Sequence, residues 1–398
     1  MSVNSVFVTG MGVISAIGDS LAANRTALVQ GTSGIGFLGP SNSRYTGELP
    51  FGGIALSNEA LRETTGVSDA GASRTTLLAA HAFRDAILDA GLSATQLSAT
   101  DTALIGATTV GGMCLTDELY RDTNGGADGS DFLASYDCAS VQQYLQTRYH
   151  MSGLVTTLNT ACSSSANAIQ YGTRLIRNGL ARRAIVGGVD SLAKYTINGF
   201  NALQILAPAA CRPFDQHRQG LNLGEGAAFL VLEREEDLKG KKVYAELTGF
   251  CNVNDAFHAS SLSPLGEGPF LAMQGALRSA GLEASAIDYI NAHGTGTENN
   301  DASESQAMLR IFGKPPPFTS TKSSTGHTLG ASGAIEAVYS ILGLFYQEAY
   351  PSLSFSSPMP ETGLRPLTEY RPTALEHVLS NSFGFGGNCT SLIFSKVN

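Results

Sequence analysis

The feature that most constrains the fold of this chain is an internal repeat of strand, small polar turn and helix. The first copy runs over 154–180 and the second over 318–344. Each copy is followed by a further apolar run, at 185–189 and at 378–387. The repeat predicts two α/β halves of common architecture. In such a fold the turns at the carboxyl ends of strands from both halves converge on one crevice.

Apolar runs typical of strands buried on both faces alternate with helical patterns along the chain. Three of these runs occupy 103–106, 184–188 and 228–232. The alternation predicts an α/β fold. A charged stretch of low hydrophobicity, 233–242, is the best boundary between the halves, which places them at 1–238 and 239–398.

Composition narrows the classes of function. Hydrophobic residues make up 43% of the 398 residues and charged residues only 15%, and the formal net charge is −9. The acidic balance argues against a nucleic-acid partner, because phosphate binding needs a net basic face. So small a charged fraction also suggests that another subunit covers part of the surface.

The cysteines and the N-terminus bear on metal binding and location. The six cysteines show no Cys-x-x-Cys pair and no metal-ligand spacing, which disfavours a disulfide framework and a structural zinc site. A reducing, cytoplasmic compartment is the simplest interpretation. The N-terminal apolar run is short and has no basic flank, so we expect no export signal, and no segment suggests a membrane span.

Cys162 lies in a small polar turn between the apolar stretch 154–158 and a helical pattern at 166–176. Unpaired N–H groups and the helix dipole at such a turn stabilise a thiolate. The placement therefore predicts a reactive cysteine with a lowered pKa, which alkylating agents modify ahead of the other five. The alternative is a small, buried, inert side chain.

Two of the seven histidines also lie in turns that follow apolar strands. His293 follows the run 290–292, and His327 occupies the second-half turn that mirrors the position of Cys162. Two imidazoles facing a turn cysteine favour a catalytic interpretation. Metal binding is the weaker alternative, because a third ligand of suitable spacing is missing.

Four motifs in this order resemble the successive signatures of the β-ketoacyl-acyl-carrier-protein synthases of the elongating type II kind. They lie at 160–164, 292–297, 322–327 and 381–388. The similarity extends over nearly the whole chain, from 8–12 to 391–394. The resemblance implies the thiolase fold, in which duplicated α/β halves form a five-layered α-β-α-β-α arrangement, usually in a homodimer. One half then carries the cysteine and the other carries both histidines.

The resemblance also implies a reaction. Cys162 would attack the thioester of an acyl group that a carrier protein delivers on its phosphopantetheine, and the acyl chain would stay on sulfur. Malonyl thioester would then lose carbon dioxide while His293 and His327 hydrogen-bond its oxygen. The resulting enolate attacks the acyl-cysteine and lengthens the chain by two carbons. No cofactor is permanently bound in this scheme.

Further residue roles are carried over from the same family. The backbone N–H groups of Cys162 and Phe385 would hold the oxyanion of acyl transfer, while Gly384 and Gly386 allow the close approach. Phe385 matches the family's gate residue. Lys322 matches a supporting lysine that ties the catalytic turns together.

Residues around these turns have supporting roles in the family. Asp301 and Glu304 would anchor two groups, the loop that follows His293 and the side chain of Lys322. They would not transfer protons. Thr295 and Thr297 match hydroxyls that contact pantetheine. Val110 matches the region that sets the depth of the acyl pocket, and simple packing is its alternative.

The chain departs from the family pattern in two places. The last motif reads Gly386-Gly387-Asn388-Cys389 where elongating synthases usually have Gly-Gly-Thr-Asn, so gate motion or chain preference could differ. The segment 201–213 is shorter and more apolar than the family's usual polar, partly basic loop, which helps to meet the carrier. Carrier docking then uses other residues, such as Arg74 or Arg212, or an apolar partner surface covers this loop.

We therefore expect an acyltransferase that condenses malonyl units with carrier-bound acyl chains, in fatty-acid or related polyketide or polyene synthesis. It would act as a homodimer or beside a paralogous ketosynthase or chain-length factor. The first alternative is a non-elongating, length-setting subunit of such a heterodimer, which the retained Cys162 opposes. A cysteine hydrolase fits less well, because hydrolysis needs a positioned water.

Overall fold

The computed structural model describes residues 5–37, 43–126, 129–130 and 132–397. In this part of the chain ten strands form one sheet in the order β3-β2-β4-β5-β1-β6-β12-β11-β7-β8. A separate two-stranded sheet pairs β9 with β10. The strands are β1 (Val6–Ser15), β2 (Thr102–Ala107), β3 (Val155–Leu158), β4 (Arg183–Asp190), β5 (Gly226–Arg234), β6 (Ala245–Asn254), β7 (Tyr289–Asn291), β8 (Phe318–Thr319), β9 (Glu348–Ala349), β10 (Arg371–Pro372), β11 (His377–Phe383) and β12 (Asn388–Ser395).

The strand order is mirrored about its centre, which confirms the internal repeat. Strands β3, β2 and β4 run parallel, as do β8, β7 and β11, and each set continues into two antiparallel strands. The repeated segments of the sequence therefore supply equivalent strands, β3 with β8 and β4 with β11. The halves join where β1 pairs with β6 at Phe7–Glu246 and Val8–Ala245.

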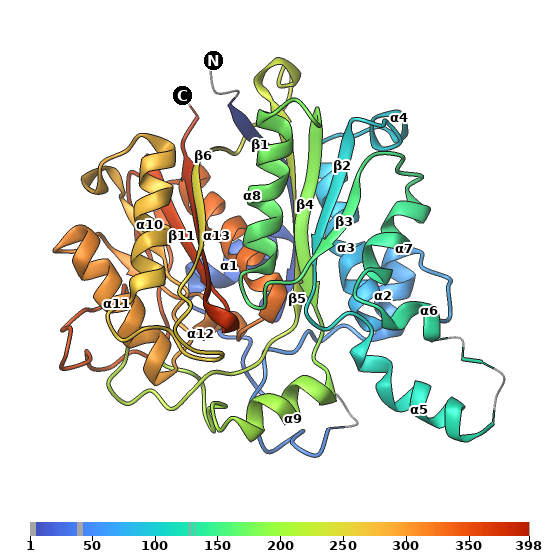
Figure 1. The fold of residues 1–398 in the computed structure, drawn as a ribbon, viewed down its shortest axis with the longest axis horizontal. Coiled ribbons are helices and arrows are strands. Elements are labelled where there is room, and N and C mark those ends of the chain that lie inside the picture. Colours follow the sequence, from blue (N-terminus) through green and yellow to red (C-terminus); the bar gives the residue numbers. More distant parts are fainter. Residues whose placement is uncertain (1–4, 38–42, 127–128, 131, 398) are drawn as a thin grey trace.

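Helices complete five layers around the two halves of this sheet, as Figure 1 shows. The helices α8 (Ser164–Arg177) and α13 (Ser332–Tyr346) pack together in the middle. Outside them, α3 (Arg74–Asp89) covers β1 and β5, and α10 (Glu267–Ala280) covers β6 and β12. This is the α-β-α-β-α arrangement that the resemblance implies.

The other helices surround these layers. They are α1 (Leu21–Gln30), α2 (Asn58–Thr65), α4 (Ala94–Leu97), α5 (Thr116–Asn124), α6 (Leu133–Tyr136), α7 (Ser140–Arg148), α9 (Lys194–Ala202), α11 (Glu298–Phe312) and α12 (Lys322–Thr325). Serine side chains cap the N-termini of four helices, because a hydroxyl accepts a hydrogen bond from a backbone N–H left free in the first turn. The capping residues are Ser20, Ser57, Ser73 and Ser93.

The central helix α13 corrects one expectation. Within the described residues, the segment 329–346 is long and apolar enough to cross a membrane, with a mean hydropathy of 1.3. It is 89% buried inside the protein, between the two halves of the sheet. A helix that is almost entirely apolar is expected wherever protein covers every face.

The charged stretch at 233–242 links β5 to β6, where the sequence predicts a boundary. It is not fully solvated. Glu233 is buried and its carboxylate pairs with Arg183 at 2.6 Å and with Lys241 at 2.5 Å. The link between the halves is therefore fixed by buried ion pairs.

Candidate active site

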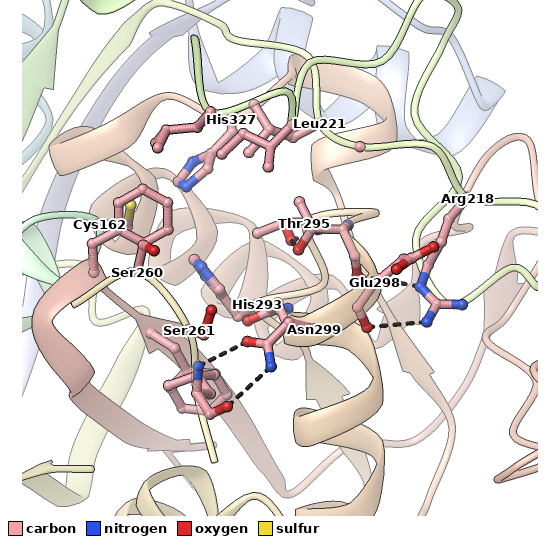
Figure 2. Close-up of a pocket in the computed structure, with 18 of the residues that line it drawn as sticks. Cys162, Arg218, Leu221, Ser260, Ser261, His293, Thr295, Glu298, Asn299 and His327 are labelled. Atoms are coloured by element: carbon pink, nitrogen blue, oxygen red, sulfur yellow. Dashed lines mark hydrogen bonds between the residues drawn. The ribbon is translucent and has the colours of Figure 1, made fainter. Parts of the chain in front are cut away.

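A cavity of about 510 Å³ brings Cys162, His293 and His327 together. The three residues come from turns that are far apart in the sequence, and Figure 2 shows their side chains pointing into the same space. Other predicted site residues that line the cavity are Thr295, Thr297, Gly384 and Phe385. The crevice that the repeat predicts therefore exists, and both halves of the chain build it.

Cys162 lies in a tight turn between β3 and α8. Ala161 has a φ of +55°, a left-handed conformation that is unfavourable for a residue with a side chain. The hydroxyl of Ser164 donates to the carbonyl of Ala161 at 2.5 Å and accepts the N–H of Thr160 at 2.8 Å. These bonds hold the turn that presents the thiol to the cavity.

The prediction of a lowered thiol pKa is wrong for this structure. Burial is the largest effect and raises the pKa of Cys162 to about 12, although Lys322 and the N–H of Phe385 act in the opposite direction. The helix α8 begins at Ser164, two residues beyond the thiol, and does not offset the loss of water. The resting thiol is thus protonated. The predicted preferential alkylation of Cys162 loses its basis.

The two histidines lie edge to face, with ring centroids 5.4 Å apart. The Nδ1 atom of His293 is 3.2 Å from the ammonium of Lys322, and the Nδ1 atom of His327 faces the N–H of Leu329 at 3.3 Å. A donor on Nδ1 selects the tautomer with a proton on Nε2. Burial and the charge of Lys322 hold the pKa of both rings well below 6.5, so both are neutral.

Lys322 is buried at the centre of the site and has a partner that the sequence analysis missed. Its ammonium donates to the carbonyl oxygen of His293 at 2.7 Å and pairs with the carboxylate of Glu336. Burial raises the pKa of Glu336 to about 7, against the effect of Lys322. The sequence did hold a signal, because Glu336 is the one charged residue in the otherwise uncharged stretch 332–346.

Asp301 and Glu304 of α11 hold the loop that follows β7. Glu304 accepts the N–H groups of His293 and Gly294, both at 2.9 Å. Asp301 accepts the N–H of Thr295 at 3.0 Å. Asp301 also accepts the N–H of Phe214 at 2.7 Å, and Glu304 accepts the amide of Asn381 at 3.1 Å. In the described part of the chain Lys322 pairs with Glu336 instead of these two carboxylates, which corrects that part of the expectation.

The hydroxyls of Thr295 and Thr297 lie 2.8 Å apart on the cavity wall, next to the loop that Asp301 fixes. Figure 2 shows Thr295 across the cavity from Cys162. Neutral hydroxyls at this wall suit an uncharged, amide-bearing ligand arm.

The loop after β11 approaches the thiol closely. The backbone N–H of Phe385 acts on the thiol of Cys162 and lowers its pKa, against the larger effect of burial. A Cβ on Gly384 would lie 2.7 Å from the carbonyl oxygen of Thr160, and Gly386 has a φ of +81°, so both positions require glycine. The ring of Phe385 stacks on Phe200 of α9, with centroids 5.8 Å apart.

Two other expectations change. Val110 does not line the cavity among the described residues but belongs to a packed apolar cluster with Leu192, Ile197 and Leu329, which fits its packing alternative. Arg74 is held by the carboxylate of Glu225 at 2.6 Å and by nearby carbonyls, so it is not available to dock a carrier.

The fold and the site together define a class of enzyme. A duplicated thiolase fold with a cysteine and two neutral imidazoles around one cavity is the architecture of a condensing enzyme. The family models "Beta-ketoacyl synthase, N-terminal domain" and "Beta-ketoacyl synthase, C-terminal domain" match residues 3–238 and 244–356. The chain belongs to the β-ketoacyl synthase family.

Similar proteins span the whole chain. The 3-oxoacyl-acyl-carrier-protein synthase 2 of Synechocystis sp. is 32% identical over 411 residues, 98% of each chain, and that of Vibrio harveyi is 32% identical over 420 residues and the full length of both. The ishigamide ketosynthase/chain length factor structure superposes with a TM-score of 0.94 at 28% identity over the full length of both chains. The structure of the ketosynthase ApeO in complex with its chain length factor ApeC, from Xenorhabdus doucetiae, gives 0.86 at 33% identity, with 99% of this chain and 98% of that chain covered.

Proposed function

We propose that this protein catalyses the decarboxylative Claisen condensation of malonyl-acyl-carrier protein with an acyl chain held as a thioester on Cys162. The observation that carries the proposal is the pair of neutral imidazoles, whose Nδ1 atoms face donors while the rings share a cavity with the thiol. Two fixed Nε2–H donors suit an enolate oxygen.

The first half-reaction is acyl transfer. The sulfur of Cys162 attacks the carbonyl carbon of the acyl thioester, and the bond from that carbon to the carrier's sulfur breaks. The thiol proton ends on the departing pantetheine sulfur. The N–H of Phe385, which lies in the cavity wall with the cysteine, stabilises the negative charge that develops on the carbonyl oxygen.

The second half-reaction forms the carbon–carbon bond. Malonyl thioester loses carbon dioxide, and the electron pair of the broken bond moves onto the thioester as an enolate. The imidazoles of His293 and His327 donate to the enolate oxygen. The enolate carbon attacks the acyl-cysteine, and the thiolate of Cys162 departs and takes up a proton from solvent.

Lys322 supports this step from behind His293. Its ammonium keeps the Nδ1 atom of His293 an acceptor and lowers the pKa of both rings. Glu336 balances the charge of the lysine within a site that excludes water.

The related proposals follow from the same site. Thr295 and Thr297 contact the pantetheine arm, which arrives on the carrier, and no permanent cofactor takes part. Phe385 gates the acyl side of the cavity, with Phe200 stacked on it.

The two halves of the chain divide between residues 238 and 239, which is supported by the family models that end at 238 and begin at 244. The protein works in the cytoplasm.

The partners are an acyl carrier protein and a second ketosynthase-like subunit, a twin or a paralogue. Similar structures include a carrier protein in complex with its ketosynthase and a ketosynthase with its chain length factor. These relatives also keep the length-setting alternative open. The retained Cys162, placed against both histidines, favours an active condensing subunit.

The test is to incubate the purified protein with acyl-carrier protein and malonyl-carrier protein. We expect a β-ketoacyl product from the wild type, and none from the matched variant Cys162→Ala. A folded wild type that forms no product at any acyl length refutes elongation. A stable, active homodimer in native mass measurements removes the support for a length-setting role.

A further inference from the structure

The residue after the Phe385–Gly387 turn is Asn388, one of the positions at which the chain departs from its family's usual motif. Its side-chain oxygen accepts three hydrogen bonds. The donors are the hydroxyl of Ser163 at 2.7 Å, the amide of Asn167 at 2.8 Å and the amide of Asn252 at 2.7 Å. A single side-chain oxygen therefore holds three separate side chains in place.

These donors come from both halves of the chain. Ser163 directly follows Cys162, Asn167 lies at the start of α8, and Asn252 lies on β6. The backbone carbonyl of Asn388 also accepts the N–H of Gly384 at 2.8 Å. Asn388 therefore contacts the turn that carries the nucleophile and the loop that carries the N–H of Phe385.

A second set of contacts orients the donors. The hydroxyl of Thr390 donates to the side-chain oxygen of Asn167 at 2.8 Å and accepts from the amide of Asn252 at 2.8 Å. The amide of Asn167 also reaches the hydroxyl of Thr160 at 2.8 Å. With their other atoms engaged, the two amides do not readily turn elsewhere if the oxygen of Asn388 is removed, whereas the hydroxyl of Ser163 also lies 2.8 Å from the carbonyl oxygen of Thr160 and keeps that acceptor.

We propose that Asn388 is a positioning residue that holds the sulfur of Cys162 in register with the N–H of Phe385. A threonine hydroxyl, attached at Cβ, ends one bond closer to the backbone than an asparagine oxygen and does not take the same three donors. The inference rests on the proposed function and deepens it. It assigns Asn388 to acyl transfer alone, because the partners of the histidines lie elsewhere.

The test separates the two half-reactions. Asn388→Leu keeps the size of the side chain and removes its acceptor. We expect acylation of Cys162, followed by intact mass after mixing with acyl-carrier protein, to slow by about ten- to hundredfold. Release of carbon dioxide from malonyl-carrier protein changes by less than about threefold. Asn388→Thr gives the same split in a milder form and serves if the leucine variant does not fold.

A double-mutant cycle checks the contact itself. Ser163→Ala alone slows acylation, and in the Asn388→Leu background its effect is smaller, because the bond between the two side chains is already lost and only the contact of the hydroxyl with the carbonyl of Thr160 remains to be removed. Equal losses in both half-reactions, unchanged acylation, or fully additive effects would overturn the assignment. Failure of the wild type to form product refutes the proposed function instead, so the two failures are distinguishable.

Discussion

Replacing Lys322 by methionine tests the central interaction of the site. Methionine has similar length and no charge, so Lys322→Met removes the donor to the Nδ1 atom and the carbonyl oxygen of His293, at 3.2 and 2.7 Å. It also leaves the buried carboxylate of Glu336 without its cation. The substitution therefore perturbs both catalysis and stability, and the two effects have different origins.

The contacts of Lys322 set the size of the loss in stability and of the loss in catalytic rate. Removing one partner of a buried ion pair costs about 3–5 kcal/mol of unfolding free energy, and less here if Glu336 takes up a proton. Freeing His293 to adopt the wrong tautomer should lower the decarboxylation rate by about 10²–10³, as for the loss of one oxyanion donor. Acylation of Cys162 should fall by less than about tenfold, because Lys322 acts on the thiol only by lowering its pKa against the larger effect of burial.

The double variant Lys322→Met/Glu336→Leu separates the two effects. Removing both charges should recover most of the unfolding free energy in urea titrations, because a buried pair can be replaced by apolar groups at little cost. Carbon dioxide release from malonyl-carrier protein should stay slow. If the double variant regains decarboxylation together with stability, Lys322 acts only through folding and the reasoning fails.

Two further predictions concern the loop and the histidines. Gly384→Ala places a Cβ 2.7 Å from the carbonyl oxygen of Thr160, next to the nucleophile, and should slow acylation by about a hundredfold. The control Gly199→Ala, where a Cβ meets nothing within 4 Å, should leave the acylation rate unchanged. Equal acylation rates of the two variants, followed by intact mass, would contradict this prediction. The pKa of His293 and of His327 lies well below 6.5 in the folded chain, so below about pH 6.5 the unfolded chain binds more protons, and the unfolding free energy decreases as the pH is lowered. His293→Ala should make this pH dependence weaker in urea titrations from pH 7 to 5. An unchanged pH dependence would count against neutral rings.

The sequence predicted the architecture because the architecture is repeated. Two copies of strand, turn and helix specify equivalent strands. The strand order of the sheet places β3 and β8 at its two ends, and β4 and β11 at equivalent positions on either side of its centre. The three catalytic turns could be assigned for the same reason, since each follows an apolar strand.

The partners within the site could not be predicted, because they depend on contacts between distant segments. Asn388 meets Asn167 across 221 positions and Asn252 across 136, and no local pattern encodes such pairs. The prediction of a lowered pKa for Cys162 was wrong for a related reason. A helix start is visible in the sequence, whereas the extent of burial is set by the assembled loops.

The protonated resting state of Cys162 has a consequence for the lifetime of the enzyme. Peroxides and stray electrophiles attack thiolates far faster than thiols. A sulfur that loses its proton only when it reacts with an acyl thioester is therefore oxidised slowly between turnovers. Burial of the turn thus both protects the cysteine from oxidation and keeps it ready for its substrate.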